Sequence, residues 1–530
     1  MKKYLVLMLV LVFVIGFVVG GCGPAEDVVD EPDNGEVIAE GQDLVIAIGA
    51  EPESLDPLTM NSAPAATVAE HMVDNLVYLA VDGSLEPSLA ESWEPTEDGQ
   101  AWVLNLRQGV TFHDGEPMNA EAVKYNLDRF MAKGDFEGGQ AAIYAFLLSE
   151  ITEVEVVDEY TVMLHLAQEF APIISHLSHT FIGIHSPASL EALDAGENVT
   201  APVGTGPFKY VSWDRGEQIV MEKYEDYWGD VPQLDTVTFK FVPEASSRVI
   251  MLETGEAHAI MAVPPTDIER LNAVDGIDVV FENSVRVIYM GFNLEDEKFQ
   301  DVRVRQALNH AIDKEAIIAT IFQGVGEPSS APIVPAVFGY NQVGPYQYDP
   351  DLARELLAEA GYADGMDIEL FHPTGRYSQD ATVTEAVQAM FAEVGVNASL
   401  TTYEWGTYLD TVITPPDQAE HDIYMLGWGT VTLDADYGLY ALFHSTQWPP
   451  RNNVSYYANS DVDALLDEAR VTPDRGVREG LYAEVIEIIW NDAPWIFLHN
   501  EGQVNAVRSN VIGLIHHPLE NILAWDAYIE

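Results

Sequence analysis

Two short segments combine residue types that could bind a small charged molecule. The first contains Arg376, in the sequence PTGRY (373–377), between a stretch with strand character and one with helical character. Ligands of α/β proteins tend to bind beyond the carboxyl ends of strands. A guanidinium there can form two parallel hydrogen bonds with a carboxylate. The segment therefore predicts a carboxylate-binding arginine, although an ordinary surface ion pair would explain Arg376 equally well in so acidic a chain.

The second segment runs from Gly427 to Tyr437 and mixes a large aromatic side chain with carboxylates. Trp428 could stack on a ligand, while Asp434 or Asp436 could receive an ammonium group. The alternative is a core tryptophan followed by carboxylates that cap the next helix. The residue types leave both interpretations open.

Alternating strands and helices would position both segments. We expect strands over 367–371, 398–403 and 422–427, and a helix over 380–394 between the first two. A further helix is indicated by Asp349-Pro350 at its start and Gly361 just past its end. This alternation of strands and helices predicts an α/β lobe.

Strands and helices are also predicted between residues 43 and 166. Periodicity predicts a strand over 43–50, a helix over 67–78, a strand over 102–106, a helix over 119–130 and a hairpin of 151–157 with 161–166.

The N-terminus has the order of an export signal. Lys2 and Lys3 precede an apolar run that reaches Val19, and small residues lead to Cys22, the single cysteine of the chain. We therefore expect residues 1–21 to be a signal peptide. A permanent membrane anchor is the alternative, but the run is at the short limit for a spanning helix.

The sequence Val-Gly-Gly-Cys resembles the bacterial lipobox, which predicts lipidation of Cys22. Two or more acyl chains would hold the protein stably at a membrane. Residues 22–42 are acidic, contain Pro and Gly and have few bulky side chains, so we expect a disordered linker after the lipid.

Composition limits the classes of function. The chain of 530 residues has 86 acidic and 24 basic residues and a net charge of −62. Such a charge excludes ordinary nucleic-acid binding, which needs clustered Lys and Arg. It also predicts a saline or alkaline habitat, where counterions screen self-repulsion. The hydrophobic content of 48% indicates a globular body, large enough for two or three lobes.

Several segments together resemble one family, the extracellular solute-binding proteins of peptide, glutathione and nickel importers (solute-binding family 5). The most specific part is LAESWE (89–94), which is followed in order by Asp98-Gly99, Trp102, Leu104, Leu106-Arg107, Gly109-Val110, Phe112-His113-Asp114-Gly115 and Pro117. Further matches are SLDP (54–57), GTGP (204–207), VRQAL (304–308) and the segments 353–361 and 453–457. The resemblance extends from about residue 43 to the C-terminus.

The resemblance implies an α/β, periplasmic-binding-protein-like fold with two lobes, a hinge and an extra inserted domain. Domain Ia would comprise 43–73, 203–283 and 503–530, domain Ib would be the insertion 74–202, and domain II would be 284–502. The hinge would be formed by two crossings, near 284–294 and 495–503.

The implied function is that of a lipid-anchored substrate-binding protein of an ABC importer. It would capture glutathione or a short peptide between the lobes and deliver it to the permease subunits. We expect a monomer on the extracytoplasmic face of the cell membrane, without a cofactor or a bound metal and without enzymatic activity.

The resemblance also bears on the site. Dipeptide-binding relatives place a carboxylate-binding arginine in a loop similar to that of Arg376. They carry an amine-binding aspartate a few residues after the tryptophan, where this chain has Val431. That departure disfavours the usual dipeptide mode, and the stretch looks more like relatives assigned to glutathione. Supporting candidates for ligand contact are Met60, Asn61, Thr205, Asn293, Tyr403, Trp405 and Tyr437.

Other chemistries have weaker support. His176 and His179 share a helical spacing but lack the companions of a zinc site. Nickel-binding relatives place a histidine near the position of Asp436, which disfavours chelated nickel. Ten tryptophans would also suit an oligosaccharide binder. No Gly-x-Ser-x-Gly elbow, His-Glu-x-x-His motif or phosphate loop occurs in the chain, so an enzyme is not expected.

Overall fold

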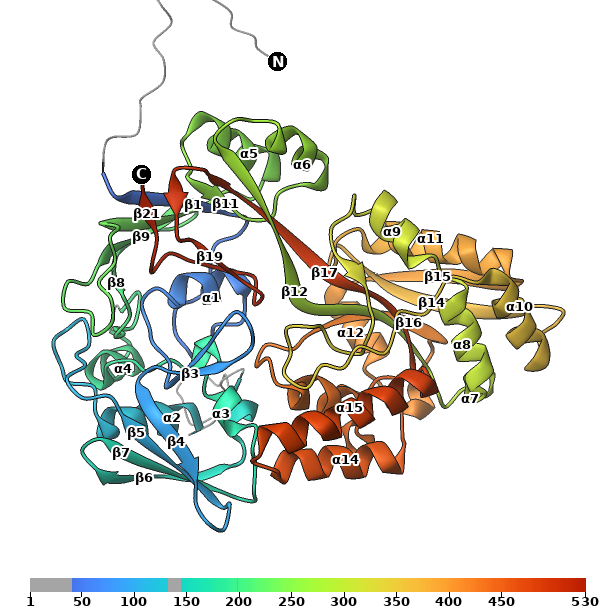
Figure 1. Ribbon diagram of the computed structural model, residues 1–530, viewed down its shortest axis with the longest axis horizontal. Coiled ribbons are helices and arrows are strands. Elements are labelled where there is room, and N and C mark those ends of the chain that lie inside the picture. The colour runs from blue at the N-terminus through green and yellow to red at the C-terminus, as the bar shows by residue number, and fades with distance from the viewer. Residues whose placement is uncertain (1–40, 132–143, 198) are drawn as a thin grey trace, which may run out of the picture. The chain divides into compact units, whose positions relative to one another are not determined.

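The computed structural model describes residues 41–131, 144–197 and 199–530 (Figure 1). The predicted signal peptide, Cys22 and nearly all of the linker lie outside the described residues.

A mixed sheet forms the centre of the structure. Its strands are β1 (Asp43–Ile48), β8 (Phe208–Asp214), β9 (Gln218–Lys223), β10 (Thr236–Phe241), β11 (Ala259–Ile260), β12 (Ile277–Phe292), β13 (Glu327–Pro328), β14 (Met366–Thr374), β15 (Val396–Glu404), β16 (Ile423–Gly429) and β17 (Trp495–Arg508). The order is β15-β14-β16-β12-β17-β11-β1-β10-β9-β8, and β13 pairs with β17. One half of the sheet thus contains β1 and β8–β11, the other contains β14–β16, and β12 and β17 join them.

The long strands β12 and β17 are antiparallel and lie side by side in Figure 1. At one end, Ile277 and Val504 belong to a hydrophobic cluster of the first half. At the other end, Tyr289 and Phe497 belong to a cluster of the second half. The pairing register shifts between Asn283 and Val287, so the ladder is interrupted between the two cores.

The second half brings the ends of two strands together. β14 and β15 are parallel and in register from Met366, opposite Val396, to Thr374, opposite Glu404. Their carboxyl ends therefore reach the same edge of the sheet, where helices α11 (Asp380–Glu393) and α12 (Trp405–Val412) begin soon after. The predicted strand–helix alternation in this region is confirmed, with boundaries that differ by a few residues.

A separate four-stranded sheet is formed by residues between Ala90 and Leu166. Its strands are β4 (Ala90–Pro95), β5 (Ala101–Leu106), β6 (Ile151–Asp158) and β7 (Thr161–Leu166), in the order β4-β5-β7-β6. β6 and β7 form the expected hairpin. Helix α2 (Ala120–Met131) begins where predicted, because Oδ1 of Asn119 accepts a hydrogen bond from the N–H of Ala122.

One helix prediction is wrong. The segment 67–78 was expected to be helical, but α1 spans Ala63–Ala69 and β2 spans Val77–Leu79. Turns and extended backbone join the two, and the backbone N–H groups of Gly206 and Phe208 bond to the carbonyls of Met72 and His71 in this stretch. Tertiary contacts thus outweigh the apolar spacing that suggested a longer helix.

The remaining elements cover the sheets or connect them. They are β3 (Leu85–Pro87), α3 (Ile173–His176), α4 (Pro187–Asp194), α5 (Ala245–Thr254), α6 (Pro265–Asn272), α7 (Glu297–Gln300), α8 (Val302–His310), α9 (Lys314–Thr320), α10 (Pro350–Glu359), α13 (Ala441–Phe443), α14 (Ser460–Val471), α15 (Arg475–Asp492), β18 (Val511–Ile512), β19 (Ile515–His517), β20 (Asn521–Leu523) and β21 (Tyr528–Ile529), with short 3-10 helices at Ala145–Leu148, Thr180–Ile182, Pro416–Gln418 and Ser445–Gln447 and a π-helical turn at Asp436–Tyr440.

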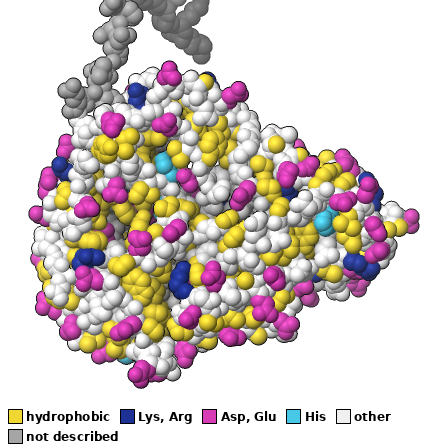
Figure 2. All heavy atoms as spheres, viewed as in Figure 1, with side chains coloured by type: hydrophobic (Ala, Val, Ile, Leu, Met, Phe, Trp, Pro, Cys, Tyr) yellow, Lys and Arg dark blue, Asp and Glu magenta, His cyan; other side chains and the backbone are white. Residues whose placement is uncertain are grey.

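The surface reflects the composition. Figure 2 shows Asp and Glu side chains distributed over the visible face, with few Lys and Arg side chains among them. In the part of the chain that the structure describes, no helix is long and apolar enough to span a membrane.

Candidate ligand-binding site

Arg376 lies in the loop between β14 and α11, at the sheet edge described above. Its side chain is exposed, and its guanidinium carbon lies 5.1 Å from the ring centroids of both Tyr377 and Trp405. Its backbone N–H donates to Oδ2 of Asp380, 3.0 Å away, at the start of α11. Among the described residues, no carboxylate lies within ion-pair distance of this guanidinium. Two aromatic rings thus hold a cation that is open to an external anion.

Tyr377 connects this loop to the second predicted segment. Its hydroxyl accepts a hydrogen bond of 2.8 Å from the N–H of Gly427 in β16. Trp428 follows and is half-buried, with its ring centroid 5.4 Å from that of Tyr437. No described residue accepts a hydrogen bond from the buried Nε1–H of Trp428. The structure therefore brings the two segments together, as one site would require.

A cavity of about 520 Å³ lies beside β12 and β17. Its lining includes Ala63 from α1, Ser284 and Glu501 from the two long strands, Glu520, and Ser378 from the loop of Arg376. Both halves of the structure thus contribute to its wall, next to the interruption in the ladder.

Arg286 pairs with the two glutamates that line this cavity. Nε of Arg286 lies 3.0 Å from Oε2 of Glu501, and its Nη2 lies 3.6 Å from Oε1 of Glu520. Burial raises the pKa of Glu501. The positive charges of Arg286 and Arg376 partly oppose this effect and lower the pKa. The group has two carboxylates and one cation within ion-pair distance, so it carries an excess negative charge when both acids are ionised.

The carboxylates of the second segment are engaged within the protein. Asp434 is 2% exposed, and its Oδ1 lies 2.6 Å from Nη2 of Arg478 in α15. Asp436 is 4% exposed, and its Oδ1 lies 3.2 Å from Nε of Arg470 in α14. Burial raises the pKa of Asp436 to about 6. These geometries correspond to internal ion pairs rather than to a free receptor for an ammonium group.

The supporting candidates divide in the same way. Met60 is 1% exposed within an apolar cluster, and Thr205 is fully buried and donates to Asp74. Asn293 is 7% exposed and donates to the carbonyl of His421. The side chains of these three candidates are thus occupied inside the fold.

The other candidates remain accessible. Asn61 is exposed, and Tyr403 and Trp405 are half-buried. Trp405 contacts Arg376, whereas Tyr403 lies 5.8 Å from the ring of Phe371 in β14. Of the candidates named from the sequence, Arg376 contacts Trp405 and Trp428 contacts Tyr437, and the hydrogen bond from Gly427 to Tyr377 links the loop of the first pair to the strand of the second.

Sequence reasoning missed Arg286, Glu501 and Glu520. A signal was present, because Glu501 interrupts a strand of mostly apolar and neutral residues at one of the two predicted crossings. Its partner Arg286 lies at the other crossing, and only the pairing of β12 with β17 places them together.

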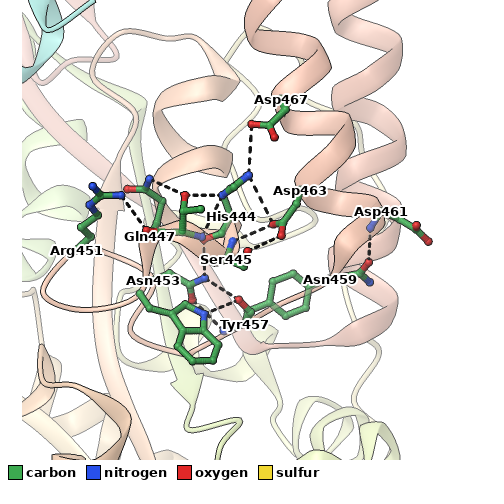
Figure 3. A network of polar contacts seen from close by, with 12 residues as sticks. His444, Ser445, Gln447, Arg451, Asn453, Tyr457, Asn459, Asp461, Asp463 and Asp467 are labelled. Atoms are coloured by element: carbon green, nitrogen blue, oxygen red, sulfur yellow. Dashed lines mark hydrogen bonds and ion pairs between the residues drawn. The ribbon is translucent and has the colours of Figure 1, made fainter.

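A second acidic cluster has a different character. Figure 3 shows the ring of His444 facing Asp463 and Asp467 of α14, with Nε2–Oδ1 distances of 3.9 and 3.4 Å. Asp463 also accepts hydrogen bonds from the backbone and hydroxyl of Ser445, and Asn453 donates to the carbonyls of His444 and Tyr457. The network fastens the segment before α14 to that helix. Within the described residues, no group of three or more His, Cys, Asp or Glu could hold a metal ion.

Comparison with known proteins decides the family. The model of the bacterial extracellular solute-binding proteins, family 5 middle region, matches residues 84–450. The chain belongs to this family. The glutathione-binding protein GsiB of Pectobacterium atrosepticum is 34% identical over 481 residues, which cover 90% of this chain and 92% of the relative. GsiB of Salmonella typhimurium is 34% identical over 478 residues, which cover 89% and 91%.

Solved structures agree with this family assignment. HbpA2 from Haemophilus parasuis has a TM-score of 0.85 and 28% identity, and the match covers 92% of this chain and 100% of HbpA2. The periplasmic binding protein DppA from Helicobacter pylori, in complex with the peptide STSA, has a TM-score of 0.75 and 29% identity, with 92% and 98% covered. The predicted family and the two-lobed α/β fold are confirmed, and this family 5 chain is a solute-binding protein of an ABC importer rather than an enzyme.

Proposed function

We propose that this family 5 protein binds glutathione or a short peptide between its lobes and delivers it to the permease of its importer. The observation that carries the proposal is the exposed guanidinium of Arg376, which lies against two aromatic rings without an ion-pair partner among the described residues. The chain has 86 acidic residues and 24 basic ones, yet no described carboxylate pairs with this arginine. Relatives named for glutathione, and a structural neighbour with a bound peptide, support the same ligand class.

We place the ligand between Arg376 and the cavity, with Trp405, Trp428 and Tyr437 as aromatic walls, and Asn61 and Tyr403 as further contacts. Met60, Thr205, Asn293, Asp434 and Asp436 are not included, because their side chains are engaged inside the fold. Closure of the lobes about β12 and β17 would enclose the ligand.

The domain division and the surroundings of the protein are also part of this proposal. The domains are 43–73 with 203–283 and 503–530 (Ia), 74–202 (Ib) and 284–502 (II). Cys22 carries the lipid after removal of residues 1–21, and 22–42 is the tether. The protein is then a monomer on the extracytoplasmic face of the cell membrane, in a cell from a saline or alkaline habitat.

Titration calorimetry on the full-length chain tests the ligand class. The panel contains glutathione, peptides of two to five residues and cello-oligosaccharides. We expect heat with glutathione or a peptide, and a loss of about 10- to 100-fold in affinity for Arg376→Gln, because a charged hydrogen-bonded pair contributes about 1.5–3 kcal/mol. The matched control is Arg354→Gln, which changes an arginine on α10 that is already paired with Asp351. Heat only with the sugars would refute the proposal and favour an oligosaccharide binder.

The lipid anchor has its own test. Cells that express the chain are grown with radiolabelled palmitate, and the wild type is compared with Cys22→Ala. The label should appear in the wild type and be absent from the variant. Equal labelling of both would exclude Cys22 as the lipidation site.

A further inference from the structure

The carboxylates at the cavity outnumber the cation that pairs with them. Arg286 contacts Oε2 of Glu501 and Oε1 of Glu520, and Oγ of Ser284 also donates to this Oε1 at 2.7 Å. Within the described part of the chain, no hydrogen bond is made to Oε1 of Glu501 or to Oε2 of Glu520. Each carboxylate can therefore still accept a hydrogen bond from a ligand.

Both carboxylates can be reached. The side chains of Glu501 and Glu520 are 23% and 28% exposed, and both line the cavity of about 520 Å³. Oε1 of Glu501 and Oε2 of Glu520 are not fully buried, so a ligand can reach both oxygens. A partly desolvated carboxylate in such a cavity gains more from a bound cation than an exposed one does.

The loop that carries the cation Arg376 lies close to these carboxylates. Ser378, two residues after Arg376, lines the same cavity as Glu501 and Glu520. The charge of Arg376 acts on the Glu501 carboxylate, and the charges of Arg286 and Glu501 act on the hydroxyl of Tyr377 next to Arg376. One small molecule can therefore meet an open arginine at one end and two carboxylates at the other.

We propose that Glu501 and Glu520 are the ammonium-binding residues of this protein, and that they select ligands carrying a free primary amine together with a carboxylate. The inference rests on the proposed function and sharpens it. The ammonium group would donate to Oε1 of Glu501 and Oε2 of Glu520 and neutralise their excess charge, while Arg376 holds the carboxylate. The site would discriminate against neutral sugars, which carry neither charge, and against peptides with a blocked amino terminus.

The test compares two ligands on each protein variant. The ligands are reduced glutathione and glutaryl-cysteinyl-glycine, which lacks only the amino group. The proteins are the full-length wild type, Glu501→Gln, Glu520→Gln and the control Glu479→Gln, which changes an exposed carboxylate on α15. If the panel above identifies a peptide instead of glutathione, the pair is that peptide and its N-acetyl form.

In the wild type and in Glu479→Gln, we expect loss of the amine to weaken binding about 10- to 100-fold, since a charge-assisted hydrogen bond is removed. In Glu501→Gln or Glu520→Gln this ratio should fall severalfold. A variant that folds poorly would bind both ligands in smaller amount but would keep the ratio of their dissociation constants, so the ratio reports recognition of the amine and not folding.

The outcomes separate this inference from the proposed function. Equal affinity of the wild type for both members of the pair would overturn the inference and leave the function intact. A wild-type ratio that both Gln variants preserve would also overturn it. Failure of the wild type to bind glutathione or any peptide would refute the proposed function, and the inference with it.

Discussion

The buried pair of Asp434 and Arg478 allows a structural role to be distinguished from a binding role. The two side chains are 2% and 3% exposed and lie 2.6 Å apart. In Asp434→Asn the guanidinium keeps the hydroxyl of Tyr482 at 2.8 Å but loses its counter-charge inside the protein. Breaking one partner of a buried pair typically costs about 3–5 kcal/mol, because the remaining charge is desolvated and uncompensated. We expect a loss of that size in the free energy of unfolding.

Urea denaturation, followed by tryptophan fluorescence, measures the effect. The double variant Asp434→Leu/Arg478→Met removes both charges and should recover most of the stability, since apolar replacements of a buried pair are often neutral. The control is Asp467→Asn, whose side chain is 64% exposed and whose change should stay within about 0.5 kcal/mol. At 25 °C, folded Asp434→Asn should bind ligand within twofold of the wild type. Wild-type stability with a large loss of affinity would refute the reasoning and make Asp434 a ligand contact.

Three further predictions concern stability. His71 is fully buried with both ring nitrogens bonded to backbone groups, and burial lowers its pKa from 6.5 to about 4. Between these values the folded state binds fewer protons than the unfolded state, so stability should fall as the pH drops from 6.5 to 4, by about 3 kcal/mol for this group. Urea midpoints across this range should show a shallower pH dependence for His71→Gln than for the wild type, and parallel curves would contradict the assignment. Gly480 lies inside α15 with nothing within 4 Å of an added Cβ, so Gly480→Ala should raise stability by about 0.5–1 kcal/mol. Gly206→Ala should lower the melting temperature, because its Cβ would lie 2.5 Å from the carbonyl carbon of Met72, and an unchanged value would refute this close approach.

Much of the second half of the fold is predictable from local pattern. The strands β14, β15 and β16 and the helices α10 and α11 appear close to their expected positions, because apolar period, caps and turn residues agree there. The segment 67–78 fails because its backbone bonds to residues more than a hundred positions away. Periodicity contains no information about such partners.

The positions of the candidate residues were predictable to a similar extent. The location of Arg376 between a strand and a helix could be predicted because both elements follow from local pattern. The role of Asp434 could not, because its partner lies 44 residues along the chain. Glu501 was missed for the same reason, since Arg286 meets it only through the long-range pairing of β12 with β17. Charges whose partners are local can be interpreted from sequence, and charges whose partners are distant require the fold.

The acidic surface has a consequence for the kinetics of capture. A molecule with a net charge of −62 repels an anion such as glutathione at long range, and Arg376 attracts it only at short range. Dissolved salt shortens the reach of the repulsion, from a Debye length of about 30 Å at 0.01 M to about 3 Å at 1 M. Encounter should therefore become faster as salinity rises, the reverse of the usual case in which a protein attracts its ligand from a distance. High salt would thus assist uptake, because it screens the repulsion between a strongly acidic receptor and an acidic ligand.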